Sequence, residues 1–304
     1  MSLFIEVDQI SHIQGEYLTQ NLVPDIPAEE SELEPGKKEE KTTRELAAPI
    51  PISLIVNAIE SAIANYSIAD FKNLPPIDEV KKEDYYGPIG ESNLVIPGSL
   101  IVGAFPGSAY DTENTNNLIN ILNCGITMFV CMQLEYNPDA PEYMWRTTGK
   151  SIRPYFKDVQ KIMENKHEYA SLIAETGMPT FVHCPIRDCS IVADDVVFNL
   201  AIKLAQAIRD GEILYLHCWG GHGRTGVVVC LILHLLYGLT ADEAIERCEL
   251  VHMMRRMPCD VGSPQTPAQV QQVRRIITSS FAKQNNGPDN KMPNVATVLN
   301  FAHL

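Results

Sequence analysis

The pattern of apolar and polar positions changes at Asn93. After this residue, short apolar runs alternate with amphipathic segments, whereas residues 24–45 are acidic, contain prolines and offer few side chains for burial. Such a composition is typical of a solvated linker. We therefore expect an N-terminal extension at residues 1–92, a main domain at 93–283 and a C-terminal tail at 284–304.

One segment of the extension has the pattern of a folded element. Ile52–Ile63 carries apolar residues at helical spacing and follows Pro51, which predicts a single helix that docks on the main domain. The pattern fits both a packing element and a regulatory or targeting arm, and it assigns the extension no function.

Beyond Asn93 the pattern predicts strands that alternate with helices. Strands are expected on both sides of the turn at Pro97-Gly98 and at 127–132, 180–191 and 213–218. Helices are expected at 112–124, 194–210 and 224–237, after Thr240 and after Thr266, with a less regular stretch at 143–177 that becomes helical in its second half. This alternation is typical of an α/β domain whose central, largely parallel sheet is flanked by helices.

The loop between the strand ending at Cys218 and the helix from Arg224 has the composition of an anion-binding site. Its glycines let the backbone curl so that successive N–H groups point inward, and the following helix adds the positive end of its dipole. Arg224 can hold two phosphate oxygens with its planar guanidinium. A thiol at Cys218 should lose its proton readily in this setting and become a nucleophile.

The run His217-Cys218-x5-Arg224-Thr225 resembles the signature of the cysteine-dependent protein tyrosine phosphatase superfamily. The residues of this motif are most similar to those of the compact dual-specificity and kinase-associated branch. The resemblance implies a tyrosine-phosphatase-like fold and a cysteinyl-phosphate intermediate formed on Cys218, with Thr225 donating toward the sulfur and no cofactor. It implies that the phosphate is bound by Arg224 and by the backbone of Trp219, Gly220, Gly221, His222 and Gly223. His217 is either a loop-fixing group or a core histidine.

A second loop, Pro185-Ile186-Arg187-Asp188, resembles the acid loop of small dual-specificity phosphatases. This resemblance implies that Asp188 gives the proton to the leaving oxygen. Asp194 and Asp195 are rival acids, but they stand where a helix begins, and carboxylates there are explained by the helix dipole. The chain departs from the resembled pattern at Val192, where the loop usually has a proline.

The glutamines of Ser263-Pro-Gln-Thr-Pro-Ala-Gln269 resemble the glutamine loop that positions hydrolytic water in tyrosine phosphatases. The candidates are Gln265 and Gln269. A capping box with Thr266 explains Gln269 without any role in catalysis.

Charge and composition exclude several function classes. The net charge is −14 and the chain has no long basic run, so neither nucleic acid nor an anionic membrane is an expected partner. The longest apolar stretch, Val227–Tyr237, is too short for a membrane span. The start of the chain lacks the features of a signal peptide and the eight cysteines contain no CxxC pair, so we expect a cytoplasmic protein.

The cysteines and histidines do not predict a metal site. Cys184, Cys189 and His183 lack the usual zinc spacing. A disulfide between an oxidised Cys218 and Cys184, Cys189 or Cys259 is the alternative use that the sequence leaves open.

These features predict a metal-independent phosphatase that acts on phosphotyrosine in phosphorylated proteins. Phosphoserine and phosphothreonine are further candidate substrates, and the sequence does not decide between tyrosine-only and dual specificity. A phosphoinositide or inositol-polyphosphate phosphatase is the second reading, although members acting on such polyanions place lysines within the loop. A phosphate-binding scaffold with little turnover is the third, because of Val192 and the unassigned extension. The sequence assigns no oligomeric state.

Overall fold

Six strands form one sheet in the part of the chain that the computed structural model describes, residues 4–6, 74–76, 79, 81–169 and 172–285. The strand order is β1-β5-β4-β6-β3-β2. The strands are β1 (Phe4–Glu6), β2 (Ser92–Ile96), β3 (Leu100–Gly103), β4 (Met128–Gln133), β5 (Thr180–Ile186) and β6 (Leu214–His217). All neighbouring pairs are parallel except β2 and β3. The predicted α/β class with a largely parallel sheet is confirmed.

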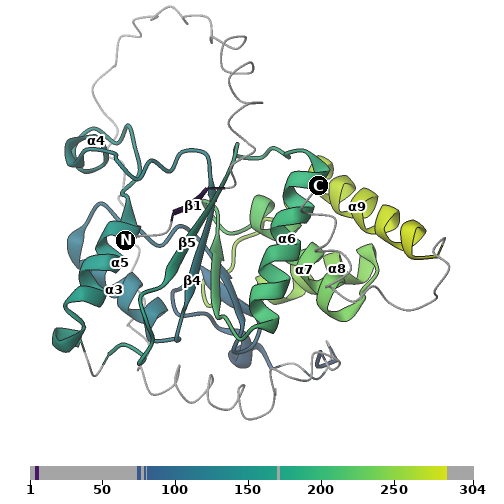
Figure 1. Ribbon diagram of the computed structural model, residues 1–304, viewed down its shortest axis with the longest axis horizontal. Coiled ribbons are helices and arrows are strands. Elements are labelled where there is room, and N and C mark those ends of the chain that lie inside the picture. The colour runs from purple at the N-terminus through teal and green to yellow at the C-terminus, as the bar shows by residue number, and fades with distance from the viewer. Residues whose placement is uncertain (1–3, 7–73, 77–78, 80, 170–171, 286–304) are drawn as a thin grey trace, which may run out of the picture. The chain divides into compact units, whose positions relative to one another are not determined.

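Helices cover both faces of this sheet, as Figure 1 shows. On one face lie α3 (Asp111–Leu122) and α5 (Tyr155–Glu164). The other face carries α6 (Asp194–Arg209), α7 (Gly223–Tyr237), α8 (Ala241–Met253) and α9 (Pro267–Asn285). The short elements are α4 (Glu142–Arg146) and the 3-10 turns η2 (Lys82–Tyr85) and η3 (Lys166–Tyr169). None of the helices described is both long and apolar enough to cross a membrane.

Strands β4 and β6 lie in the middle of the sheet and are buried on both faces, so their residues are almost continuously apolar. Helix α7 is buried on nearly every side as well, because it contacts α6, α8 and α9 as well as the sheet. Residues 228–233 of this helix are at most 1% exposed. The helix therefore has a fixed position, and so does the loop that precedes it.

Helix ends follow the predicted signals. Gly238 has φ 68° at the end of α7, a left-handed conformation that suits glycine. Thr240 and Glu243 form a capping box at the start of α8, and Thr266 and Gln269 exchange the same pair of hydrogen bonds at the start of α9.

The folded unit begins before the predicted boundary at Asn93. Tyr85 is buried, and the Met257 amide donates to the Gly90 carbonyl at 2.9 Å. The sequence concealed this because residues 82–92 pack through glycines, prolines and turns rather than through a periodic pattern. Strand β1 also falls inside the predicted extension, whereas the linker at 24–45, the helix at 52–63 and the tail beyond Asn285 lie outside the described residues.

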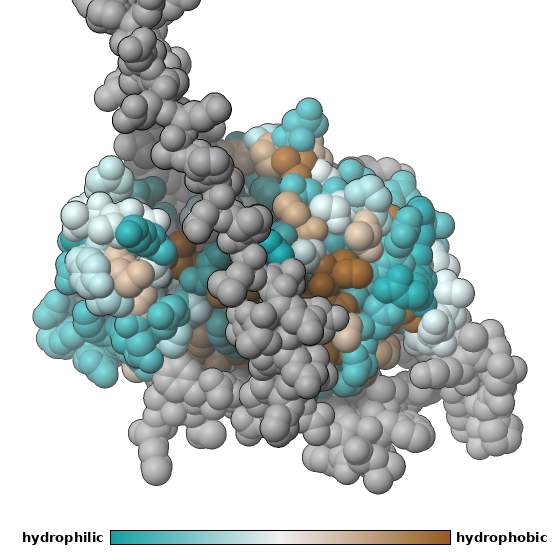
Figure 2. Space-filling view, turned by 90° about the horizontal axis from the view of Figure 1, so that it is seen from above, coloured by the Kyte–Doolittle hydropathy of each residue, from teal (hydrophilic) through white to brown (hydrophobic). Residues whose placement is uncertain are grey.

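Apolar and hydrophilic side chains are interspersed on the face drawn in Figure 2, with small brown patches among teal. Among the residues that the structure describes, the large apolar side chains that are exposed are Tyr110, Leu134, Tyr143, Met178, Ile191, Trp219, Met253 and Met257. Among these, Trp219 belongs to the predicted phosphate loop and is 56% exposed.

Candidate active site

The predicted phosphate loop connects β6 to α7 at the carboxyl end of the sheet. Strand β6 lies between β3 and β4, so the loop emerges from the middle of the fold. Cys218 follows the last strand residue and is 3% exposed. This is the edge at which parallel α/β sheets bind their ligands.

The backbone carbonyl groups of residues 219–222 in this loop all accept hydrogen bonds from neighbouring segments. The Phe105 amide donates to the Trp219 carbonyl at 2.8 Å. The carbonyls of Gly220 and Gly221 accept from the two terminal nitrogens of Arg255, each at 2.8 Å. The last loop carbonyl, that of His222, accepts from Ser263 Oγ at 3.1 Å and from the Gly226 amide at 2.8 Å.

The amide groups are consequently left for a ligand. None of the hydrogen bonds within the described ranges has an amide of residues 219–222 as its donor. A peptide whose carbonyl is held outward directs its N–H the other way, and α7 begins immediately behind with the positive end of its dipole. The loop therefore has the arrangement of an anion-binding nest.

Two glycines are required by close contacts. Gly221 has φ 71°, and a Cβ there would collide with the Gly103 carbonyl. A Cβ on Gly223 would lie 2.7 Å from Gln269 Oε1. Any larger side chain at these two positions would displace the loop from β3 or from the start of α9.

Arg224 is 2% exposed and reaches three oxygens. Its NH1 donates to the Ile186 carbonyl at 2.8 Å and pairs with Glu135 at 3.3 Å, while NH2 pairs with Asp188 at 2.7 Å. The Nε atom is buried and has no partner among the described residues. The guanidinium is thus fixed by a carbonyl from β5 and faces two carboxylates.

The structure brings Asp188 to the phosphate loop, where the sequence places the acid. Its carboxylate meets Arg224, and the backbone turns sharply at Cys189, which has φ 55°. The rival Asp194 is the first residue of α6 and forms an ion pair with Arg275 at 2.6 Å, which lowers the pKa of Asp194 mainly through that hydrogen bond. The exposed Asp195 follows it in the first turn of the same helix.

Helix α9 holds the segment after Asp188. Gln272 is 1% exposed and donates to the Val192 carbonyl at 2.6 Å and to Asp194 Oδ1 at 2.9 Å. Gln269 is completely buried and donates to the Ser190 carbonyl at 3.2 Å. The acid loop is therefore attached at two points to a long helix.

The two predicted water-positioning glutamines have different surroundings. Gln269 Oε1 accepts from the amides of Gln265 and Thr266 at 3.2 and 3.0 Å, so both ends of its amide are occupied. Gln265 is exposed, and a role for its side chain in positioning water stays a prediction.

His217 supports the loop from within the core. Its Nδ1 lies 3.2 Å from the Cys218 carbonyl, which can only accept, so Nδ1 carries the proton and Nε2 accepts from the Tyr155 hydroxyl at 2.7 Å. Burial lowers the pKa of His217 to about 3, and the imidazole is therefore neutral. Both readings left open by the sequence fit, because His217 is a fully buried histidine bonded at both nitrogens and one of these bonds reaches the first carbonyl of the loop.

Several polar groups beside the loop are buried without a partner in the described part of the chain. They include Thr225 Oγ1 and the side-chain amide of Gln133, in addition to Arg224 Nε. The bond from Thr225 toward the Cys218 sulfur stays a prediction, because no such contact is formed here. Trp219 stacks on Phe105 with 6.0 Å between ring centroids and 7° between ring planes.

The site contains residues that the sequence did not single out. Glu135, Arg255, Ser263 and Gln272 each contact the phosphate loop or the acid loop, yet they come from four different segments. No local motif marks them, because long-range packing alone brings them to the site. The only nearby feature of the sequence is the run Cys259–Gln269, which contains turn residues and leads into a helix.

The predicted absence of a metal site rested on His183, Cys184 and Cys189, and these three do not come together as a ligand group. His183 donates to the Gln133 carbonyl at 2.8 Å, and Cys184 is buried in the core. A different group forms within the described ranges, consisting of His222, His252 and Cys259, with all ligand atoms within 4.8 Å of one another. All eight cysteines are free.

Comparison with known proteins links the chain to phosphatases. "Putative tyrosine phosphatase 197R" of Invertebrate iridescent virus 6 is 26% identical over 103 residues, 33% of this chain and 34% of the viral protein. The protein of the same description, 067L, of Invertebrate iridescent virus 3 is 30% identical over 82 residues, covering 26% and 34%. The chain thus spans about a third of the length of these curated relatives. The crystal structure of Tk-PTP in its active form aligns with a TM-score of 0.40 and 15% identity, over 62% of this chain and 97% of that chain.

A family model described as "Swiss Army Knife protein, DSP-PTPase phosphatase domain" matches residues 91–275, more than half of the chain. The matched region begins just before β2 and ends within α9. It therefore includes both loops described above and five of the six strands of the sheet, all but β1. The chain belongs to this family of DSP-type tyrosine phosphatase domains.

Proposed function

We propose that the protein is a phosphatase that hydrolyses phosphotyrosine in proteins through a cysteinyl-phosphate intermediate. The observation that carries this proposal is the juxtaposition of two loops. The phosphate loop has its carbonyls turned outward, and Asp188 reaches Arg224 at its rim at 2.7 Å. An anion site, a thiol and an acid meet at one edge of the sheet.

In the first step, the Cys218 thiolate attacks phosphorus while the bond to the tyrosyl oxygen breaks. The loop amides and the Arg224 guanidinium hold the three equatorial oxygens, which carry charge in the transition state. Asp188 gives its proton to the departing phenolate oxygen. The products are free tyrosine hydroxyl and phosphate bonded to sulfur.

In the second step, water attacks the phosphorus and the bond to sulfur breaks. Asp188, now ionised, takes a proton from the water, and Thr225 donates toward the leaving thiolate. Gln265 is the candidate for holding the water, because the amide of Gln269 is already bonded at both ends. Inorganic phosphate and the original thiolate are regained without a metal or another cofactor.

The surroundings of the site favour a singly phosphorylated aromatic side chain. A cavity of about 530 Å³ adjoins Asp188 and is lined by Glu135, Gly149, Lys150, Ser151, Ile152, Asp188 and Trp219. Two carboxylates and one lysine repel a densely charged ring more than a single phosphate. Trp219, held flat against Phe105, offers an apolar wall to a phenyl group.

A phosphoinositide or inositol-polyphosphate phosphatase is less well supported, because the phosphate loop has no lysine among residues 219–223. The scaffold reading is weakened by the attachment of the acid loop to α9 despite Val192. Free cysteines throughout the fold support a reducing compartment such as the cytoplasm.

A substrate panel tests the proposal. The purified protein should hydrolyse an aryl phosphate and phosphotyrosyl peptides in the presence of chelator, at higher kcat/KM than soluble inositol phosphates. Cys218→Ser should abolish turnover, whereas Cys124→Ser, a matched change at a buried cysteine just after α3, should not. Turnover that survives Cys218→Ser would exclude the mechanism, and faster hydrolysis of inositol phosphates would exclude the substrate class.

A further inference from the structure

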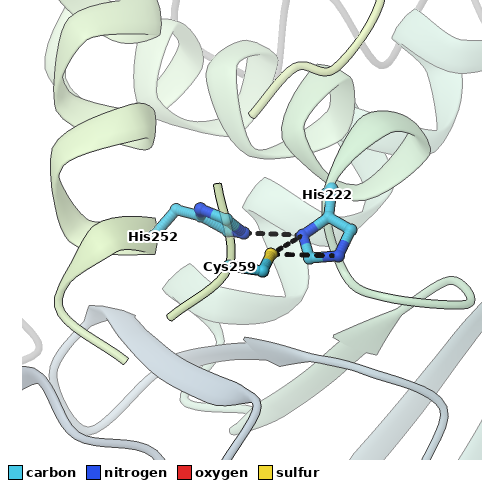
Figure 3. A group of neighbouring side chains, drawn as sticks. All are labelled: His222, His252 and Cys259. Atoms are coloured by element: carbon cyan, nitrogen blue, oxygen red, sulfur yellow. Dashed lines mark hydrogen bonds between the residues drawn. The ribbon is translucent and has the colours of Figure 1, made fainter. Parts of the chain in front are cut away.

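Three ligand-type side chains meet beside the phosphate loop without being used in the mechanism above. His222 belongs to the loop, His252 to the last turn of α8, and Cys259 to the segment that follows α8 (Figure 3). His222 Nδ1 lies 2.7 Å from His252 Nε2. The Cys259 sulfur lies 3.7 Å from His222 Nδ1 and 3.6 Å from Nε2. Segments distant in sequence thus converge on one point.

The chemistry of the donors fits a borderline-soft divalent cation. Two imidazoles and one thiolate are a set of ligands that Zn²⁺ takes, with one coordination position left for water. The 2.7 Å contact between His222 Nδ1 and His252 Nε2 requires that at least one of these nitrogens accepts, so it carries the lone pair that a metal ion needs. His252 is buried, while His222 and Cys259 are half-buried, which leaves a route for the ion.

The distances from His222 to the other two ligands need one small adjustment, and the remaining pair, Cys259 and His252, lies within 4.8 Å. Tetrahedral bonds of zinc to nitrogen and sulfur separate two nitrogens by about 3.3 Å and a nitrogen from the sulfur by about 3.6 Å. The sulfur already lies 3.7 Å from His222 Nδ1. The two histidine nitrogens, at 2.7 Å, must move apart by about 0.6 Å.

Little opposes this movement. The bond between the two rings is the one hydrogen bond that the His252 side chain makes within the described ranges, because its Nδ1 is buried without a partner. A cation between the rings would replace the proton that they share. The positive charge of Arg255 acts on both histidines and so weakens the binding of a cation between them.

We propose that His222, His252 and Cys259 bind a Zn²⁺ ion that links the phosphate loop to the segment after α8. Cys259 binds as the thiolate and releases its proton. The ion is exchangeable rather than permanent, because no second group orients His252 and because Arg255 repels a cation. Bound zinc holds the loop in the conformation described above and so raises the thermal stability of the domain.

Cobalt titration of the full chain tests the site, with all variants built on Cys218→Ser so that the predicted nucleophile cannot bind the metal. The parent should bind one Co²⁺ with a thiolate-to-cobalt charge-transfer band, and Zn²⁺ should displace it. Cys259→Ser should lose the band, and His252→Gln should bind at least tenfold more weakly. The matched controls Cys189→Ser and His167→Gln, both at exposed residues, should behave like the parent.

A missing band in the parent, or a band that persists in Cys259→Ser, would overturn the proposal. If Cys259→Ser does not fold, alkylation of Cys259 in the parent decides, because Zn²⁺ must slow it and an unchanged rate contradicts the site. These measurements involve no turnover, so they stand apart from the test of the phosphatase activity.

Discussion

Gln272 donates a 2.6 Å hydrogen bond to the carbonyl of Val192. Val192 stands where the resembled acid loop has a proline, a residue that stiffens a loop by fixing φ. Gln269 makes the same kind of bond to Ser190. Two glutamines of α9 therefore restrict the acid loop through hydrogen bonds, where a proline would restrict it through its fixed φ. They keep Asp188 directed at the phosphate loop.

Replacing Gln272 by Leu should release this loop. The change removes the hydrogen bonds to Val192 and to Asp194, and loss of the one to the acid-loop carbonyl, about 1 kcal/mol, predicts a fall in kcat of about fivefold on a substrate with a poor leaving group. The fall should be smaller on an activated aryl phosphate, whose leaving group needs less help from Asp188. Steady-state kinetics on both substrates measure the difference.

Two further variants separate loop attachment from general damage. Val192→Pro added to Gln272→Leu should restore part of the lost kcat, whereas Gln271→Leu, on the exposed side of α9, should have no effect. Equal losses on both substrates, with no rescue by the proline, would speak against a role for Gln272 in positioning the acid.

Arg255→Lys should weaken the phosphate loop. Arg255 is 1% exposed and donates to Asn93 Oδ1 at 2.8 Å as well as to two loop carbonyls. Lysine keeps the charge but cannot reach all three acceptors, and each lost charged hydrogen bond costs about 1.5–3 kcal/mol. Urea unfolding should show this loss, and the inhibition constant for inorganic phosphate should rise. Arg256→Lys is the neighbouring control, and equal effects in the two variants would refute a special role for Arg255.

Glu135→Gln should tighten phosphate binding. The Glu135 carboxylate pairs with Arg224 at 3.3 Å and is 45% exposed, so it competes with a phosphate but is screened by water. Removing its charge predicts a decrease of about two- to fivefold in the inhibition constant for inorganic phosphate. Glu142→Gln, which removes a partner of Arg146 instead, should leave that constant unchanged. A weaker affinity for phosphate in Glu135→Gln would mean that the carboxylate supports Arg224 rather than competing for it.

Stability should fall in mild acid because His217 is buried as the neutral form. Its pKa is about 3 in the fold and about 6.5 when unfolded, so the unfolded chain binds more protons below pH 6.5. The full stability is present above pH 6.5 and falls as the pH decreases toward 3. At pH 5 the loss of stability is about 2 kcal/mol. Denaturant unfolding between pH 5 and 7 measures the slope.

His217→Gln should lower the number of protons taken up on unfolding by about one and so reduce the slope. It should not abolish the slope, since His222 and His252 are also held neutral. His167→Gln, a change at a histidine that is 78% exposed, is the matched control variant. A slope unchanged by His217→Gln would contradict the assignment of the neutral imidazole.

The order of strands and helices after Asn93 follows from periodicity, and the phosphate loop follows from glycine spacing beside a cysteine and an arginine. Both are local properties, which a sequence displays. The contacts of Arg255 and Glu135 with the loop depend on which segments the sheet brings together, and no local pattern encodes them. Gln272 illustrates the limit, because its spacing on α9 marks only a buried helix face, whereas its bond to Val192 reaches across the site.

For the same reason, the sequence did not indicate His222, His252 and Cys259 as a group of possible metal ligands. The sequence contains no pair of these ligands at zinc spacing, since the turn of α8 and the loop after it bring them together. Helix α4 was not predicted because five residues are too few to show a period.

The burial of α7 on nearly every side has a consequence for the dynamics of the two loops. Amide hydrogens in the body of this helix, at residues 228–233, can exchange with solvent only when the core of the domain opens, so the helix that supports the phosphate loop belongs to the last cooperative unit to unfold. The acid loop lies at the surface and can open without it. The two loops of the site thus differ in the free energy needed to open them. The acid loop, which carries Asp188, opens more easily and is the one that can adjust to different substrates.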